Sequence, residues 1–440
     1  NGINVQAGIL TAKNIIDATN AQYNTRIGTN AGDSFSGTDA THNTLIGYNA
    51  GTAITDADHN TAVGSEALAA ATTGGVNTGI GRKALYVNTT GVENTAVGNY
   101  ALDANTTASQ NTAVGAYSAS ANTTGTANVA VGYKALLNNT TADNNTAVGY
   151  EALYTNTTAT INTALGRQAL RSNTTGADNT AVSYSLVSNT TGSNNTAVGR
   201  GALNANTTAD DNTAVGHNAL DANTTGNKNT AVGKDALTAN TTGSQNVAVG
   251  RAAANLLTTG SYNIAIGDLA LKQNTTGSGN VVIGYDALQV ASISDTVAIG
   301  RLALNLNTTG YNNIGIGASA LKANTTGSNN TATGYLSMMA CTTGTENTAY
   351  GQRTLKAVTT GAQNTALGGG ALQNNTASYN TAVGRDALIQ NTTGANNTAV
   401  GRDALNVNTT GQYNTAVGSN ALDANTTQSS HTAIGYNALG

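Results

Sequence analysis

Four histidines are the side chains of this chain best suited to bind a metal ion: His42, His59, His217 and His431. His42 and His59 each stand directly before the Asn that opens one copy of a repeated segment, so they should stack on adjacent copies, with Asp56 and Asp58 nearby. Imidazole and carboxylate groups are common zinc ligands, which makes a metal site one interpretation. We favour the other, in which both histidines are exposed turn residues and no metal is bound.

A second group of candidate residues directly follows a recurrent glycine and is often Tyr or Arg: Tyr133, Tyr150, Tyr285, Tyr335, Arg167, Arg200, Arg251, Arg385 and Arg402. On stacked repeats these side chains would lie about 4.8 Å apart. Such a row would suit stacking on sugars or contact with another surface. The alternative, which we favour, is that these residues stack within the chain and keep it soluble. Our candidate surface-contact ladder is Tyr133, Tyr150, Arg167, Arg385 and Arg402.

The patterns that mark enzymes do not recur in the chain. No Ser/His/Asp or Cys/His arrangement repeats, and no carboxylate pair stands out as a glycosidase site. Cys341 is the one cysteine, which allows neither an internal disulfide nor a cysteine-rich metal site. Single glycines at a fixed spacing are typical of turns, whereas phosphate-binding loops need a glycine cluster before a helix. We therefore expect no enzymatic activity and no cofactor.

Composition narrows the class of protein further. The 440 residues include no Pro, no Trp and 9% charged residues, against about 25% in ordinary globular domains. No apolar run reaches the roughly 20 residues of a membrane-spanning helix, and a net charge of −4 does not favour nucleic acid. A disordered low-complexity chain would share this composition, but it has no reason to keep the register described next.

The segment Asn-Thr-Ala-Val-Gly recurs from Asn4 to His431 with 26 starts; 20 of the 25 intervals are 17 residues, three are 16, and the first two are 20 and 19. The consensus is N-T-A-V-G-x-x-A-L-x-x-N-T-T-G-x-x, and we number its positions from the first Asn. Short strands between Gly and Asn turns favour one β-coil per repeat. We predict an all-β parallel β-solenoid, or β-roll, roughly 120 Å long at about 4.8 Å per coil.

Alternation along the strand assigns the side chains to faces. The second and fourth positions share one β-branched, apolar face, and the third, mostly Ala, lies on the other. We expect one face to fill the coil and the Ala face to contact a neighbouring chain closely. Within Asn-Thr-Thr, the Asn and the second Thr tolerate apolar groups, which predicts that both point inward. The middle Thr should form an outward column, and the Asn should form side-chain ladders.

The segments Asn246-Val-Ala-Val-Gly250, Asn263-Ile-Ala-Ile-Gly267 and Thr296-Val-Ala-Ile-Gly300 resemble the S-V-A-I-G repeats of YadA-like trimeric autotransporter heads. The longer unit looks like arrays in bacterial and phage tail-fibre-domain proteins. The resemblance implies a left-handed solenoid, three chains side by side, and a place on a cell surface or virion. YadA-type coils are usually shorter than 17 residues.

Together these patterns predict an irregular, cap-like start over 1–42 and a continuous solenoid over 43–440. The last copy, from His431, opens as an ordinary coil, so we expect further protein to meet that end, either more coils or the start of another copy in a filament. The predicted function is an extracellular fibre or adhesin shaft with a receptor or glycan as its partner. A phage tail-fibre shaft and an ice-binding solenoid are the alternatives.

Overall fold

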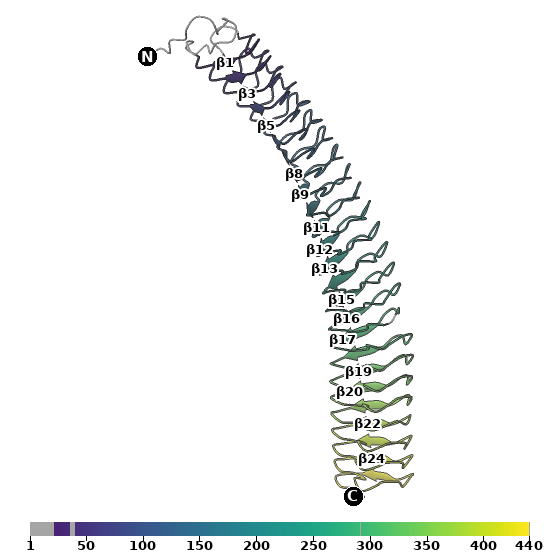
Figure 1. Cartoon of the computed structure of the whole chain (residues 1–440). Helices are drawn as coiled ribbons and strands as arrows, with labels where there is room; N and C mark the ends of the chain where they lie inside the picture. The colour runs from purple at the N-terminus through teal and green to yellow at the C-terminus, as the bar shows by residue number, and fades with distance from the viewer. Residues whose placement is uncertain (1–21, 36–39, 291, 440) are drawn as a thin grey trace, which may run out of the picture. The chain divides into compact units, whose positions relative to one another are not determined.

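The computed structural model describes residues 22–35, 40–290 and 292–439. Asn1–Asn212 and Thr213–Gly440 are two compact units. Within each unit, three-residue strands stack one above the next, one strand per coil (Figure 1). The part of the chain that the structure describes contains no helix, and hence none able to cross a membrane. The expected parallel β-solenoid is confirmed.

The described strands are numbered in chain order. The first unit holds β1 Thr25–Ile27, β2 Thr44–Ile46, β3 Thr61–Val63, β4 Thr78–Ile80, β5 Thr95–Val97, β6 Thr112–Val114, β7 Val129–Val131, β8 Thr146–Val148, β9 Thr163–Leu165, β10 Thr180–Val182 and β11 Thr196–Val198. The second unit holds β12 Thr213–Val215, β13 Thr230–Val232, β14 Val247–Val249, β15 Ile264–Ile266, β16 Val281–Ile283, β17 Val297–Ile299, β18 Ile314–Ile316, β19 Thr331–Thr333, β20 Thr348–Tyr350, β21 Thr365–Leu367, β22 Thr381–Val383, β23 Thr398–Val400, β24 Thr415–Val417 and β25 Thr432–Ile434.

Neighbouring strands pair in parallel at identical repeat positions. In β8 and β9, for example, Thr146 is opposite Thr163 and Ala147 is opposite Ala164. The backbone ladder continues beyond the strand, because the amide of Leu153 donates to the carbonyl of Ala169 at 3.0 Å. The constant repeat length brings equivalent residues together coil after coil.

The turn at the fifth position favours glycine, which one coil replaces with Ser183. Gly149 has a φ of 135°, and a Cβ added there would lie 2.4 Å from the carbonyl oxygen of Gly166 on the next coil. No L residue adopts this conformation easily, and the space is already filled by backbone. The prediction that these glycines serve the turn is confirmed.

The interior of the coil is built from small residues and one leucine. The third, eighth and ninth positions are buried, as in Ala147, Ala152 and Leu153, each with 0% of its surface exposed. The middle residue is buried in each strand from β2 to β25, whereas the residues on either side of it are half-buried or exposed. The predicted Ala contact between chains is therefore wrong, because Ala fills its own coil and the Thr/Val face points outward.

Two columns of buried asparagines connect the coils. The backbone amide of Asn145, at the first position, donates to the Oδ1 of Asn128 at 2.9 Å. At the twelfth position, the Nδ2 of Asn139 donates to the Oδ1 of Asn122 at 2.8 Å and to the carbonyl of Ala142 at 3.0 Å. The expected asparagine ladders are confirmed. Apolar residues take the twelfth position without exposure in a few coils: Ala71, Leu257, Cys341 and Val358.

The two threonines after this asparagine differ from the prediction. The second is exposed rather than inward, as in Thr107 and Thr141. The middle one is half-buried, and the hydroxyl of Thr106 donates to the carbonyl of Thr123 at 3.1 Å. The exposed column therefore belongs to the second threonine, because the middle hydroxyl is used between coils.

The misassignment of the second threonine has its origin in two 16-residue coils. There the carbonyls of Ile293 and Ala377 accept side-chain bonds from asparagines at 2.8–2.9 Å, as the fifteenth-position Gly91 does from Asn77. Ile293 and Ala377 thus occupy the fifteenth position, and the second Thr is the residue that these coils lack.

The cap-like start predicted for 1–42 lies largely outside the described residues. Of its described part, β1 pairs with β2 as an ordinary strand. Arg26 occupies the third position of its repeat, in the middle of β1. Its guanidinium donates to the carbonyl of Gly32 at 2.9 Å and lies 5.4 Å from the centre of the Phe35 ring.

Candidate functional site: the side chains beside the repeat glycine

The sixth and seventh positions place a column of side chains at one corner of the coil, directly after the glycine turn. In the first unit this column is aromatic over consecutive coils. Tyr100 stacks on Tyr117 at 5.3 Å between ring centres, Tyr117 meets Tyr133 edge to face at 6.4 Å, and Tyr133 stacks on Tyr150 at 5.6 Å. The constant coil height makes this stacking possible.

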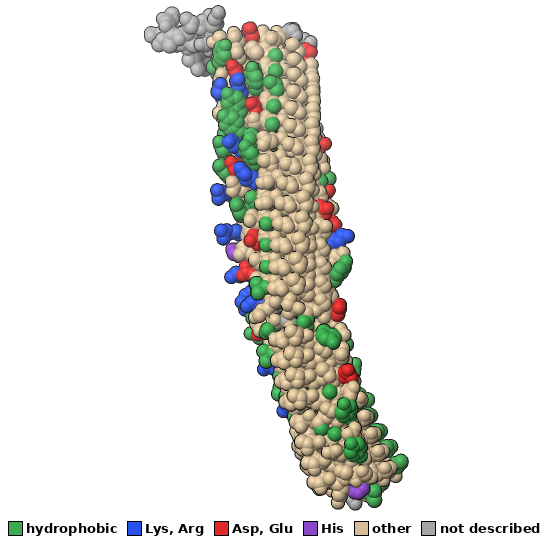
Figure 2. Space-filling view, turned by 90° about the vertical axis from the view of Figure 1, so that its right-hand side faces the viewer, with side chains coloured by type: hydrophobic (Ala, Val, Ile, Leu, Met, Phe, Trp, Pro, Cys, Tyr) green, Lys and Arg blue, Asp and Glu red, His purple; other side chains and the backbone are tan. Residues whose placement is uncertain are grey.

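An arginine side chain lies over the last tyrosine ring at each end of the tyrosine column. The guanidinium of Arg82 lies 5.1 Å from the centre of the Tyr100 ring, and that of Arg167 lies 5.9 Å from the Tyr150 ring. Figure 2 shows hydrophobic and basic side chains gathered along one edge of the first unit. Tyr133, Tyr150 and Arg167 thus lie in one column, through contacts within the chain.

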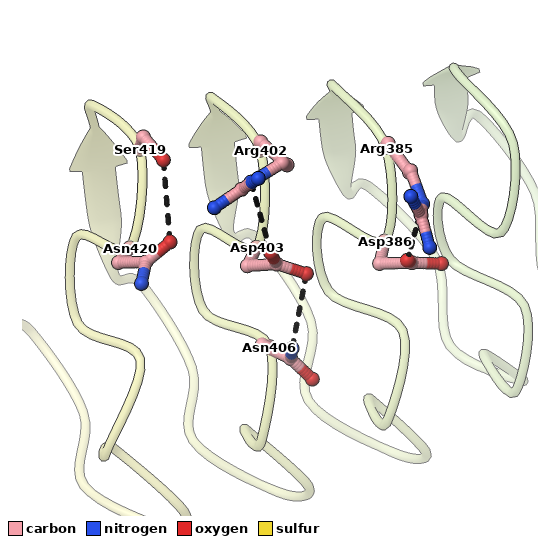
Figure 3. Close-up of polar contacts among 7 residues, drawn as sticks. All are labelled: Arg385, Asp386, Arg402, Asp403, Asn406, Ser419 and Asn420. Atoms are coloured by element: carbon pink, nitrogen blue, oxygen red, sulfur yellow. Dashed lines mark hydrogen bonds and ion pairs between the residues drawn. The ribbon is translucent and has the colours of Figure 1, made fainter.

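The other two predicted ladder residues contact acids instead. Arg385 donates from Nε to Asp386 at 3.0 Å, and Arg402 approaches Asp403 at 3.2 Å. Figure 3 shows the equivalent residues on neighbouring coils, with Ser419 and Asn420 hydrogen-bonded in place of the ion pair. These exposed pairs contribute about 0–1 kcal/mol each and reduce the positive charge of the column.

A hollow of about 530 Å³ interrupts the column just beyond Arg167. It is lined by Gly166, Arg167, Gln168, Ser183, Tyr184 and Arg200, and we call it the first hollow. It lies at the 16-residue coil that begins at Asn179. The amide of Gly201, a seventh-position residue, donates to the carbonyl of Tyr184 at 2.8 Å, as the amide of Tyr100 does to Arg82. Tyr184 is therefore the sixth residue, and the seventh is missing.

The second unit has a counterpart of about 460 Å³, the second hollow, lined by Gln352, Arg353, Gly369, Gly370, Gln373, Arg385 and Asp386. Here Gly369 and Gly370 occupy the sixth and seventh positions without side chains. A Cβ at Gly369 would meet nothing within 4 Å. In both hollows a coil with missing side chains lies between two coils that carry arginine. Only the second has a carboxylate, Asp386, in its lining.

Glu151 contacts a lining residue of the first hollow, Gln168, and its carboxylate already has partners. Glu151 accepts from the Nε of Arg171 at 2.9 Å and from the Nε2 of Gln168 at 3.1 Å. Burial acts to raise the pKa of Glu151, but these hydrogen bonds outweigh it and leave the pKa below its ordinary value. Glu151 therefore stays ionised and bound to its neighbours near neutral pH.

The histidines and the cysteine also have defined places. His42 and His59 are exposed and stack as predicted, with ring centres 4.9 Å apart, and Tyr23 continues the stack. Across the described residues, no three His, Cys, Asp or Glu side chains group closely enough to hold a metal. Cys341 is buried, and burial raises the pKa of its thiol to about 11.

Sequence reasoning missed Gln168, Tyr184 and the two glycines that open the second hollow. A signal was present, because the 16-residue interval after Asn179 marks a coil that lacks one residue. Comparison of the chain with models of protein families and with curated proteins found no match.

Proposed function

We propose that this chain is the structural shaft of an extracellular fibre or adhesin, on a cell surface or a virion, and not an enzyme. The observation that carries the proposal is the repetition of the same contacts from coil to coil within each unit: the parallel backbone ladder and the two asparagine columns. Each coil contacts its neighbours through the same bonds, so a load along the stack is shared among equivalent coils. The resemblance to YadA-like and tail-fibre repeats supports this function.

We further propose that copies of the chain pack side by side, three being the number that the resemblance favours. The support is the outward strand face from β14 to β18, which is Val or Ile at both outward positions. Its side chains remain accessible, with Val249 36% exposed and Ile264 and Ile266 both 37% exposed. A contiguous apolar surface of this kind typically marks a protein–protein contact.

Scattering and microscopy test the shaft. The proposal expects purified protein to be elongated, with a longest dimension near the roughly 120 Å derived from the coil count, and electron micrographs of native material to show fibres. A compact particle in solution would contradict it.

Sedimentation tests the side-by-side packing. Ile264→Lys together with Ile266→Lys should convert an oligomer to monomers, because two ammonium groups would be buried without partners. Tyr262→Lys is the matched control, since Tyr262 is 63% exposed and lies outside the strand. Wild-type protein that sediments as a monomer at micromolar concentration would refute the packing.

Ice binding is a second candidate, favoured by the threonine corner. The second threonines form an exposed column in the first unit: Thr90, Thr107, Thr124, Thr141, Thr158, Thr175, Thr191 and Thr208. The middle threonines beside them are half-buried, and their hydroxyls donate to carbonyls of the next coil, as that of Thr106 does. Figure 2 shows a broad band without charged side chains along the first unit. Thermal hysteresis that disappears in Thr124→Arg/Thr141→Arg/Thr158→Arg would support this function, and absence of hysteresis in the wild type would exclude it.

A further inference from the structure

The first hollow is lined by two arginines that have no acidic partner among the described residues, although Arg167 also contacts the ring of Tyr150. Arg167 and Arg200 are both exposed, and their coils are separated by the coil of Tyr184, which puts their backbones roughly 10 Å apart at about 4.8 Å per coil. No carboxylate lines the hollow. Within the described residues neither arginine forms an ion pair, whereas Arg171, Arg251, Arg385 and Arg402 do.

The remaining lining groups are neutral and polar. Ser183 and Tyr184 offer hydroxyls, and Gln168 offers its amide oxygen, because its Nε2 already donates to Glu151. The volume of about 530 Å³ falls within the usual range for small-ligand sites. Guanidinium groups bind carboxylates through two parallel hydrogen bonds, and hydroxyl and amide groups match the hydroxyls of a sugar ring.

We propose that the first hollow is a binding site for an acidic polysaccharide, in which Arg167 and Arg200 bind carboxylates of uronic acid residues and Tyr184, Ser183 and Gln168 contact the sugar hydroxyls. A polyphosphate chain such as a nucleic acid fits less well, because its binding depends on many cationic contacts and the hollow offers two arginines. An acidic peptide would use the arginines but leave the hydroxyl groups of the site without matched partners.

The missing seventh residue is what opens the site. In most full-length coils this position carries a side chain next to the column, such as Tyr117 or Glu151, although the coil that follows the 16-residue coil has Gly201 there. The 16-residue coil leaves that space empty between two arginine-bearing coils. The shaft function does not require this site, so either proposal can fail without the other.

The test is calorimetric titration of the full chain with polygalacturonate. Arg167→Gln/Arg200→Gln should weaken binding by about tenfold or more, equivalent to about 1.4 kcal/mol. The matched control is Arg353→Gln/Arg385→Gln in the second hollow, where Asp386 already offsets part of the charge; binding should change by less than about twofold. Since all four arginines are exposed, the circular dichroism spectrum and the melting temperature should stay unchanged.

A second variant tests the shape of the site. Insertion of one Asn between Tyr184 and Ser185 restores a 17-residue coil and should fill the hollow, so binding should fall although both arginines remain. Arg167→Lys/Arg200→Lys should lie between the wild type and the Gln variant, because an ammonium keeps the charge but loses the two-bond geometry.

Two further ligands separate charge from sugar recognition. Methyl-esterified polygalacturonate should bind much more weakly than the acid form, and polyglutamate should bind more weakly than polygalacturonate. The proposal is overturned if the wild type does not bind polygalacturonate, if the ester or polyglutamate binds equally well, if both double Gln variants lose the same affinity, or if the insertion leaves binding intact.

Discussion

The inner and outer faces of one strand differ far more in their environment than in their sequence. In β8, Ala147 is fully buried, whereas Thr146 and Val148 are half-buried and face outward. The smaller residue is inside because Leu153, at the ninth position of the same coil, already fills the interior. The more hydrophobic face of a strand is therefore not always the face that the fold buries.

In the first described coils the sizes of these two residues are reversed, with the large residue at the third position and glycine at the ninth. Where the third position is Leu45, the ninth is Gly51, and a Cβ on Gly51 would lie 2.8 Å from the Leu45 side chain. Arg26 is likewise matched by Gly32, whose added Cβ would lie 2.9 Å from the arginine side chain. In both coils a large side chain at the third position is matched by a glycine at the ninth, and the coil of Leu45 also buries Ile54 at its twelfth position. The size of the residue at the third position therefore limits the size of the residue at the ninth. We call this relation the exchange between the two interior positions.

Removing the large interior residue should have the largest effect on stability. Leu153→Ala is expected to cost about 2–5 kcal/mol, through lost burial and the cavity left behind. Val148→Ala on the outer face of the same coil should cost no more than about 1 kcal/mol, because part of this side chain is in water already. Chemical denaturation of both variants measures the difference, and equal losses would mean that the faces are not distinct.

Adding volume tests the exchange between the two interior positions. Ala147→Leu should cost about 1–3 kcal/mol through overpacking against the leucines. Combining it with Leu153→Gly copies the arrangement of Leu45 and Gly51, so the double variant should be more stable than the sum of the single changes predicts. A double-mutant cycle with no coupling between the two sites would refute the exchange.

Substitution in the asparagine column should lower the folding stability less than loss of the interior leucine does, and more than substitution of an exposed threonine does. Asn139→Ala removes the bond to Asn122 and leaves buried polar groups unpaired, which should cost about 1–3 kcal/mol. Thr141→Ala, two residues away and exposed, should change stability by less than about 0.5 kcal/mol. Urea melting curves compare the two variants, and a similar cost for both would show that the ladder bonds contribute little.

The smallest expected effect is a loss of folding stability at high pH, caused by the buried thiol of Cys341. Burial raises the pKa of the Cys341 thiol from 9.0 to about 11, so the unfolded chain loses this proton first as the pH rises. The thiol should therefore cost about 1 kcal/mol of stability between pH 9 and pH 10. Cys341→Asn, which restores the repeat, should remove this part of the pH dependence. Rapid alkylation of Cys341 in the native protein would contradict its burial.

The candidate site was predictable in part. Spacing alone aligned Tyr133, Tyr150 and Arg167, because any residue repeated at the period of the coil must stack. Spacing did not distinguish these residues from Arg385 and Arg402, each of which forms an ion pair with the aspartate that follows it in the chain. The hollows depend on which side chains are missing from a coil and how far their neighbours reach, and no single position of the repeat encodes that.

The sequence by itself determined the repeat length, the short strand, the glycine turn and the asparagine ladders. Each follows from residue types that suit one local conformation and recur at one period. Only the tertiary structure decided that Ala points inward, that the second Thr is exposed, and that Ile293 and Ala377 stand in for the fifteenth-position residue. These outcomes depend on the closure of the coil, which sets how much volume the interior can hold and which residue a shortened turn leaves out.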